Sequence, residues 1–140
     1  DQKMFISPST AQNSAQRIFQ DIIQALVFSS TNNSSFPTES IEMVFMPGYH
    51  FVTPEMLPSE FDITGNESEM FTFFTVIQNA SVTVRTLDCA IDTVPNSMFN
   101  PCSTSTDITP ATIYLKVPIF HFRFSQDLIL KDIVWDGTEL

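Results

Sequence analysis

The spacing of apolar residues changes once along the chain, and this change constrains the fold more than any other sequence feature. Between Ala15 and Val27, apolar residues recur at helical spacing, which is typical of one face of a long helix. From Ser81 onward they alternate with polar residues, which is typical of strands. Helices followed by consecutive strands predict an α+β fold, in which helices pack on one layer of sheet.

The N-terminal half of the sequence predicts three helices and one strand. The long helix starts at the capping segment 7–10 and ends in the polar loop 29–35. A short helix is expected over residues 38–44 and a third helix over residues 67–78. The strand between them is expected over residues 49–53.

The C-terminal half predicts three long strands joined as a meander. They are expected over residues 81–92, 111–125 and 128–135, with a polar connection over residues 93–110. We find no internal repeat. A chain of 140 residues suits one domain with one core, so we expect a single domain over residues 1–140, in which residues 1–10 form an N-terminal arm.

Composition excludes several classes of partner. The formal net charge is −10, and six Lys and Arg residues are too few for a basic stripe, so we expect no nucleic acid partner. The same charge repels an anionic membrane surface. No apolar run approaches the roughly 20 residues that span a bilayer. Because the chain starts at Asp1 without a Met, we expect a mature, processed form.

Two features indicate a secreted, extracellular protein, and the first is a set of glycosylation motifs. Four Asn-x-Ser/Thr sequons fall where loops or element ends are expected, which is where glycans must lie. They are at Asn32, Asn33, Asn66 and Asn79. The sequence therefore predicts N-glycans at these positions.

The second feature is the pair of cysteines, Cys89 and Cys102. Their spacing fits one disulfide that closes a loop, and the alternative is two buried free thiols. The chain has no Cys-x-x-Cys motif and its two His are far apart, so we expect no zinc and no other metal or cofactor.

Two segments resemble motifs of one known family. Residues 45–54 (FMPGYHFVTP) resemble a segment that ends in Asp-Pro, and residues 118–124 (PIFHFRF) resemble a Pro-Ile-Asp-His-Phe-Arg-Phe strand. On these motifs and on the order of expected elements, the chain resembles the nuclear transport factor 2 superfamily, also called SnoaL-like. Within it, the motifs are similar to the ketosteroid isomerase branch. The resemblance covers residues 11–137.

The resemblance implies a cone-shaped fold, related to the cystatin-like roll. A curved, mixed or antiparallel sheet wraps a long N-terminal helix and leaves a ligand pocket. The positions that line this pocket are Tyr49, Thr53, Phe120, Phe122 and Trp135. The alternative is a packed aromatic core in which these side chains fill the cone.

The resemblance also implies that isomerase chemistry is absent. The position of the family's carboxylate base falls on Thr53, whose hydroxyl cannot accept a proton near neutral pH. The position of the Asp that binds the oxyanion falls on Phe120, and that of the Tyr falls on Ile18, or on Phe19 after a slip of one residue. We therefore expect no enzymatic activity of this type.

Three functions remain open at this point. The first is a non-catalytic secreted module that acts by self-association or protein binding, as a subunit of an extracellular assembly. Its contact surface is expected on the outer sheet face, which carries Ile119, His121, Arg123 and Ile133. The second is a carrier of a small apolar ligand in the cone pocket. The third is an enzyme of different chemistry that uses His50, Thr53 and Asp88.

Overall fold

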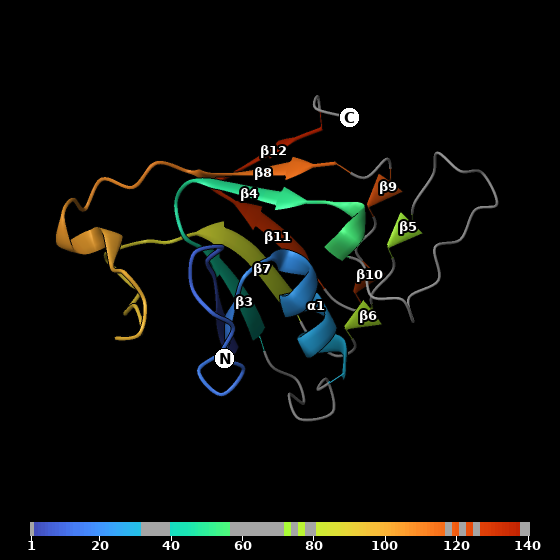
Figure 1. Ribbon diagram of the computed structural model, residues 1–140, viewed down its shortest axis with the longest axis horizontal. Helices are drawn as coiled ribbons and strands as arrows, with labels where there is room; N and C mark the ends of the chain where they lie inside the picture. The colour runs from blue at the N-terminus through green and yellow to red at the C-terminus, as the bar shows by residue number, and fades with distance from the viewer. Residues whose placement is uncertain are drawn as a thin grey trace.

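The computed structural model describes residues 2–31, 40–56, 72–73, 76–77, 81–116, 119–120, 123–124 and 127–137, and this part of the chain is mostly strand (Figure 1). The strands are β1 (Gln2–Ile6), β2 (Ile18–Phe19), β3 (Ser40–Phe45), β4 (Tyr49–Val52), β5 (Thr72–Phe73), β6 (Val76–Ile77), β7 (Ser81–Thr86), β8 (Ala111–Leu115), β9 (Ile119–Phe120), β10 (Arg123–Phe124), β11 (Leu128–Lys131) and β12 (Ile133–Asp136). The helices are α1 (Ile22–Thr31) and the 3-10 turns η2 (Pro54–Met56) and η3 (Pro101–Ser103).

All pairings between these strands are parallel. The first sheet has the order β11-β7-β3-β1-β2 and the second has the order β12-β8-β4, while β5 pairs with β9 and β6 with β10. Two strands that are parallel neighbours must be joined by a long connection. From β3 onward that connection passes through the other sheets, so the chain comes back to each sheet once in every coil. Strands β3 to β6, β7 to β10, and β11 with β12 are therefore successive coils of a parallel β-solenoid.

The register aligns apolar side chains into ladders that run through the interior. Met4 of β1 pairs with Met43 of β3, which pairs with Val84 of β7, which pairs with Leu130 of β11. The first three are fully buried. Because side chains alternate along a strand, each coil adds its own inward residues to the same core. This burial is the main source of stability of the solenoid.

Helix α1 closes the end of the solenoid at which β1 and β2 lie. It contacts β1, β2 and β6. Its apolar face belongs to the main core and includes Ile22, Ile23 and Leu26. The Asp21 carboxylate accepts the N–H of Gln24 at 2.9 Å, and the Gln24 side-chain oxygen accepts the N–H of Gln20 at 2.9 Å. These two bonds satisfy amide groups that have no partner inside the helix. No described helix is long and apolar enough to cross a membrane.

We call the segments that join a strand of the first sheet to the next strand in the second sheet the corners. Their length differs from coil to coil. The first corner is residues 46–48, where Gly48 has a φ of 117°, a conformation that favours glycine. The second is the long connection 87–110, and the third is Asp132 alone, with a φ of 52°. Thr86 joins two of these corners, because its hydroxyl donates to the Asp132 carbonyl and accepts the N–H of Ala111.

The described chain combines helix and strand, as an α+β fold does, but the expected arrangement, a curved sheet wrapped on a long N-terminal helix, is wrong. The helix has ten residues and starts at Ile22, well after the expected start. Arg17 has a φ of 58°, and the next two residues, Ile18 and Phe19, form β2 beside β1. The apolar positions before residue 20 therefore serve a turn and a strand. The expected N-terminal arm contributes β1, which lies between β3 and β2.

Two further expected helices are strands where the structure describes them. The segment 38–44 contains β3, whose Ile41, Met43 and Phe45 are all fully buried at the spacing of two that is typical of a strand. The segment 67–78 contains β5 and β6. Their β-branched and aromatic residues favour strands, and each of the two pairs with one parallel neighbour, β5 with β9 and β6 with β10.

The expected strand at 49–53 is confirmed as β4, whereas the expected meander is wrong. The segment 81–92 is a strand only to Thr86, the segment 111–125 contains three short strands, and the segment 128–135 is interrupted at Asp132. In these C-terminal segments, strands that follow each other in the sequence do not pair with each other. They pair with strands of the next coil, because the corners turn the chain into another sheet.

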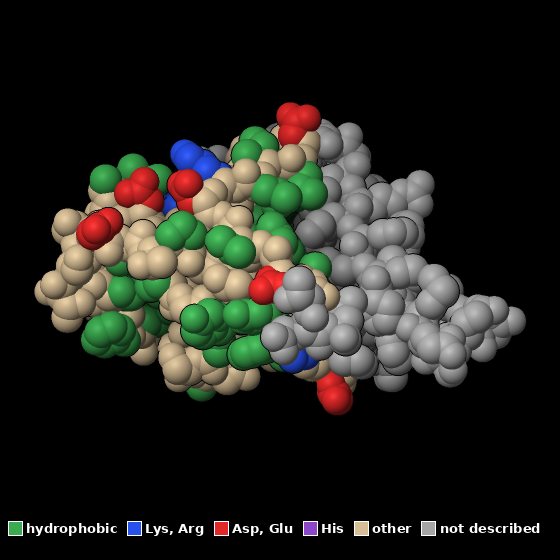
Figure 2. Space-filling model, turned by 90° about the horizontal axis from the view of Figure 1, so that it is seen from above, with side chains coloured by type: hydrophobic (Ala, Val, Ile, Leu, Met, Phe, Trp, Pro, Cys, Tyr) green, Lys and Arg blue, Asp and Glu red, His purple; other side chains and the backbone are tan. Residues whose placement is uncertain are grey.

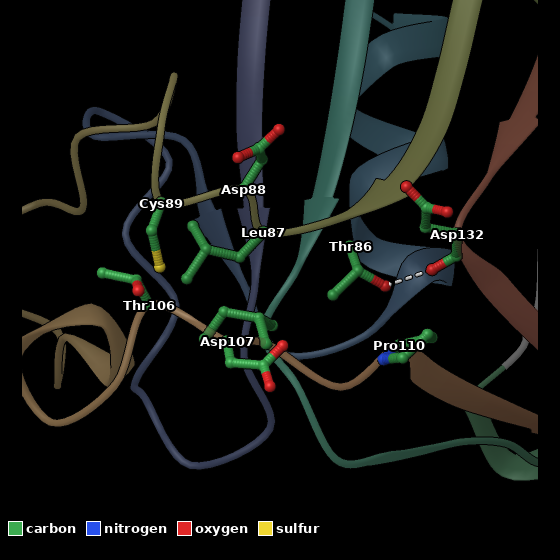
Figure 3. Close-up of a pocket in the computed structure, with 9 residues that line it drawn as sticks. Thr86, Leu87, Asp88, Cys89, Thr106, Asp107, Pro110 and Asp132 are labelled. Atoms are coloured by element: carbon green, nitrogen blue, oxygen red, sulfur yellow. Dashed lines mark hydrogen bonds between the residues drawn. The ribbon is translucent and has the colours of Figure 1, made fainter.

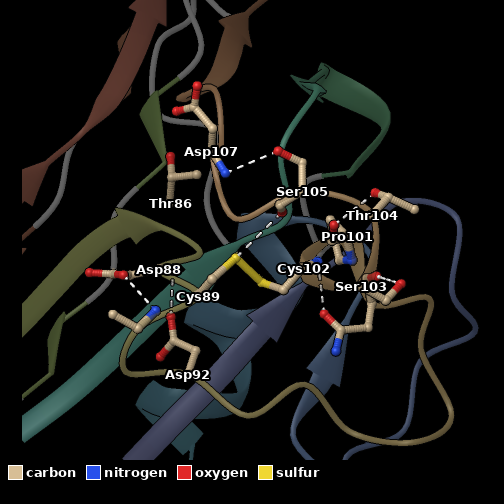
Figure 4. The surroundings of a disulfide bond; sticks show 12 residues. Thr86, Asp88, Cys89, Asp92, Pro101, Cys102, Ser103, Thr104, Ser105 and Asp107 are labelled. Atoms are coloured by element: carbon tan, nitrogen blue, oxygen red, sulfur yellow. Dashed lines mark hydrogen bonds between the residues drawn. A yellow bond between two sulfur atoms is a disulfide. The ribbon is translucent and has the colours of Figure 1, made fainter.

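The connection 87–110 packs on the outer face of the first sheet. Its apolar residues form a second buried cluster with residues of β1, β2 and β3 and of the first corner. The members are Phe5, Ile18, Val44, Met46, Leu87, Val94 and Met98. The predicted disulfide is confirmed: Cys89 and Cys102 are bonded, with 5.7 Å between their Cα atoms, and Cys102 packs against the cluster (Figure 4).

A buried carboxylate fixes this connection to two strands of the first sheet. Asp92 accepts bonds from Arg85 of β7 at 2.7 and 2.8 Å and from Lys3 of β1 at 2.7 Å, and its side chain is fully buried. Arg85 also donates to Glu42 of β3 at 2.9 Å. Burial alone raises the pKa of Asp92, but the bonds from Arg85 and Lys3 outweigh it and hold this pKa well below its usual range.

Removing the disulfide is expected to destabilise the protein. Replacing both Cys89 and Cys102 by Ser frees a closed loop in the unfolded chain, which costs about 3 kcal/mol for a loop of this size. Urea unfolding followed by circular dichroism measures the change. Wild type treated with a reductant is the matched control and should lose the same amount. Equal free energies of unfolding for the oxidised and reduced proteins contradict the claim that the disulfide stabilises the fold.

Replacing Asp92 by Ala is expected to cost about 3–5 kcal/mol of unfolding free energy, because the largely buried Arg85 loses two hydrogen bonds from a charged partner. The control is Asp107→Ala, which removes an exposed carboxylate from the same connection and should change stability by less than about 0.5 kcal/mol. Equal effects of the two substitutions in the same unfolding experiment contradict the account of Asp92.

Candidate functional site

The structure places Tyr49 and Trp135, two residues of the expected pocket, on opposite faces of the second sheet. Tyr49 points outward and is 65% exposed. Trp135 is in register with Ile113 of β8 and packs against the main core. The two side chains therefore do not line one common cavity.

The structure describes the other three residues of the expected pocket only in part. Thr53 follows β4 and is half-buried, and its carbonyl accepts the N–H of Met56 at 3.1 Å. Phe120 belongs to β9 and is in register with Phe73. The side chain of Phe120 and all of Phe122 lie outside the described residues. A pocket at Thr53, Phe120 and Phe122 stays a prediction, whereas Tyr49 does not share one cavity with Trp135.

Several other expected positions are also outside the described part of the chain. The sequons Asn32, Asn33, Asn66 and Asn79 and the second histidine, His121, all lie there. Ile119 and Arg123 belong to β9 and β10 without described side chains, and Ile133 of β12 is half-buried. Ile18, expected at a catalytic position, is fully buried in β2.

His50 lies in the interior of the solenoid, with 3% of its surface exposed. Its Nε2 is 2.7 Å from the carbonyl of Met46, and its ring lies edge-on to Phe45 with centroids 4.9 Å apart. Nε2 therefore carries the proton. Nδ1 is buried and has no hydrogen-bond partner among the described residues. Burial lowers the pKa of His50, against the opposing effect of the bond to Met46, and so favours the neutral imidazole.

Asp88, the acid considered together with His50, lies elsewhere, at a polar surface pocket beside the disulfide (Figure 3). The pocket has a volume of about 320 Å³, and three of its lining residues carry carboxylates: Asp88, Asp107 and Asp132. Asp88 itself accepts the N–H of Ala90 at 2.9 Å. Among the described residues, no three His, Cys, Asp or Glu are placed to hold a metal ion. The structure does not bring His50 and Asp88 into one site.

The end of the solenoid opposite α1 is a candidate interaction surface. We call β11 and β12 the open end, because among the described strands each forms the edge of its sheet. Four apolar residues there have between 36% and 50% of their surface exposed: Leu128, Ile129, Leu130 and Val134. Two of them, Leu128 and Leu130, continue ladders whose preceding members, Val82 and Val84, are fully buried.

Exposed apolar side chains of this kind are a feature of association surfaces when they gather on one patch. Seen from above, from the side of β12, hydrophobic side chains show at several places across the described part of the molecule, and acidic residues stand singly (Figure 2). The sequence predicted one strand over residues 128–135, but only the position of β11 and β12 in the sheets shows that they form an edge.

Comparison with known proteins does not assign this chain to a family. No family model, no curated protein and no solved structure gave a significant match. The resemblance to the nuclear transport factor 2 superfamily therefore stays a prediction, whereas the cone-shaped fold that it implied is wrong.

His50 is expected to make stability depend on pH. In the unfolded chain its pKa is about 6.5, and burial lowers it in the folded protein. As pH falls below about 6.5, His50 binds a proton in the unfolded chain but not yet in the folded protein, so the free energy of unfolding decreases. In His50→Phe this dependence should disappear, although the lost bond to Met46 lowers stability at every pH.

Urea unfolding between pH 7.5 and 5 measures this dependence. His121→Asn removes the only other imidazole of the chain and serves as the comparison. A slope that persists in His50→Phe and vanishes in His121→Asn contradicts the account.

Proposed function

We propose that this protein is a non-catalytic, secreted module that acts by self-association through the open end of its solenoid. The observation that carries the proposal is the exposure of Leu128, Ile129 and Leu130 on a strand at the edge of its sheet. Edge strands present backbone N–H and C=O groups that pair readily with another strand. A strand from a second copy satisfies these groups and covers the exposed apolar side chains.

The other end of the solenoid favours a closed dimer over a fibre. There, α1 contacts β1 and β2, and the inner ladder ends at Met4, which is fully buried. In the described part of the first sheet, a head-to-tail contact between copies meets no exposed inner ladder at this end. Two open ends therefore meet each other, which gives an isologous dimer with a two-fold axis.

The sequence of β11 is self-complementary in this arrangement. A two-fold axis at Ile129 pairs β11 antiparallel with β11 of the second copy. Leu128 then faces Leu130 of the second copy, and Asp127 faces its Lys131. Opposite charges at facing positions of an antiparallel pair stabilise the pairing, and facing apolar side chains bury each other. Asp127 and Lys131 are both exposed in the isolated chain, so they are available for this contact.

The extracellular setting of the proposal is supported by the disulfide, which persists in an oxidising environment. The four sequons are the basis for proposing N-glycans, and the net charge of −10 keeps such a module soluble. Glycans also restrict which faces of two copies can approach, and none of the sequons lies within β11 or β12.

A charge swap tests this dimer without touching the core. In Lys131→Asp, the new carboxylate of each copy faces Asp127 of the other copy, so the symmetric contact contains two pairs of like charges. The substitution is expected to weaken dimerisation by about tenfold. The double variant Asp127→Lys with Lys131→Asp restores both pairs and should restore the dimer. Sedimentation velocity over a range of concentrations measures the monomer–dimer equilibrium.

The control for apolar contacts is Ile91→Lys, which changes an exposed apolar residue in the connection 87–110, compared with Ile129→Lys in β11. Only the second should dissociate the dimer. A wild-type protein that stays monomeric at millimolar concentration overturns the proposal, as does a charge swap that fails to rescue the single variant.

A further inference from the structure

A row of aromatic rings lies on the outer face of the second sheet, away from the core. Tyr49 and Phe51 of β4 point outward, as does Tyr114 of β8, which is in register with Phe51. The Phe51 and Tyr114 rings are stacked, with centroids 5.3 Å apart and planes 14° apart, and the Tyr49 ring is 5.6 Å from that of Tyr114. We call these three residues and Lys116 the aromatic ledge.

Two shallow hollows adjoin the ledge, on a part of the surface that differs from the open end. One has a volume of about 300 Å³ and is lined by the four residues of the ledge. The other has a volume of about 400 Å³, and its lining residues are Pro47, Gly48, Tyr49, Thr109, Pro110 and Thr112. Tyr49 is common to both, so it stands between two sites that are each at the small end of the range for ligands, about 300–1,000 Å³.

Folding does not account for the exposure of these rings. Tyr49 is 65% and Phe51 45% exposed, although the same strand supplies His50 and Val52 to the buried interior. An aromatic ring that stays partly exposed gives up the share of the burial free energy that belongs to its exposed surface. Two such rings side by side on one strand are the feature of a binding surface.

We propose that the aromatic ledge binds a neutral sugar ring of a glycan chain. A pyranose has a flat face of C–H groups, which packs on an aromatic ring, and a rim of hydroxyl groups. The hydroxyls of Tyr49 and Tyr114 can both donate and accept hydrogen bonds, as sugar hydroxyls do. The Lys116 ammonium lies over the Phe51 ring, 5.9 Å from its centroid, and adds a donor at this ring.

The size of the ledge favours a sugar over a protein partner. A stable protein interface takes about 20–30 residues on each side, whereas the ledge has four. Its surface is a small group of exposed aromatic rings on a sheet, of which Tyr49, 65% exposed, offers the most ring surface to a flat sugar ring. Each hollow has room for a ring-sized group, so a chain of linked sugars can place successive rings on the two sides of Tyr49.

Charge favours a neutral sugar over an acidic one. The protein has a net charge of −10, and Asp136 of β12 is in register with Tyr114. Lys116 is the one basic residue of the ledge and cannot offset this field for a chain of carboxylates. The ledge is therefore expected to discriminate against a polyanionic glycan at low salt.

The test measures binding of cellohexaose, a neutral β-linked hexasaccharide, by saturation-transfer difference NMR and by calorimetry. Hexagalacturonate, of the same length with a carboxylate on every ring, is the matched probe. We expect cellohexaose to bind with a millimolar Kd and hexagalacturonate to bind more weakly at low salt. Concentrations up to about 10 mM leave a millimolar site mostly occupied.

Variants locate the site. Tyr49→Ala should weaken cellohexaose binding by about tenfold, whereas Tyr49→Phe keeps the ring and should retain most of it. Phe99→Ala removes a ring that is 72% exposed in the connection 87–110 and should change nothing. Because Tyr49 is mostly exposed, Tyr49→Ala is expected to unfold at the wild-type temperature, which thermal unfolding checks.

Three results overturn the proposal: no binding of cellohexaose at about 10 mM, equal binding by wild type and Tyr49→Ala, or tighter binding of hexagalacturonate. A loss of dimer in Tyr49→Ala also overturns it, because the ledge is then a protein contact. The measurement is repeated on Lys131→Asp, whose substitution lies on β11, so the outcome does not depend on whether the proposed dimer forms.

Discussion

Parallel, in-register stacking of β3, β7 and β11 is the constraint on which the rest of the structure depends. It places Met43 and Val84 on one line inside the solenoid, continues that line with the exposed Leu130 at the open end, and leaves Arg85 on the outer face. A slip of one residue exchanges the two faces of a strand. Such a slip in β7 moves a guanidinium into the apolar core and takes it away from Asp92, so the buried ion pairs and the core select the same register.

The parts of the solenoid that are covered define the surfaces that remain. Helix α1 closes one end, and the connection 87–110 covers the outer face of the first sheet, held by the disulfide and by Asp92. Among the described residues, no comparable segment covers the open end or the aromatic ledge, and these two surfaces carry the largest exposed apolar side chains on the described strands. One surface offers backbone groups of an edge strand and the other offers ring faces, so they suit partners of different chemistry.

The sequence predicted local features better than their arrangement. The disulfide and β4 were predicted, and alternation from Ser81 onward indicated β7. The segment 38–44 was taken for a helix because a short apolar run does not distinguish the two periods. The sequence does not predict that the chain winds into coils, because it shows no repeat of fixed length. The corners range from a single residue, Asp132, to the connection 87–110.

The candidate surfaces were less predictable than the strands. Tyr49 was expected in a pocket because a family resemblance placed it there, yet alternation along β4 sends it outward and sends His50 inward. The sequence contains Leu128 and Leu130 as ordinary strand residues. Whether such a residue is core or surface depends on whether another coil stacks above it, and this is a property of topology rather than of local sequence.

The central claim, parallel stacking of successive coils, is tested most directly by methyl NOE spectroscopy of selectively labelled protein. Stacking predicts cross-peaks between Met43 and Val84 and between Val84 and Leu130, because these pairs are neighbours in adjacent parallel strands. Absence of these cross-peaks, together with close Hα–Hα contacts between strands that follow each other in the sequence, indicates an antiparallel meander and contradicts the solenoid.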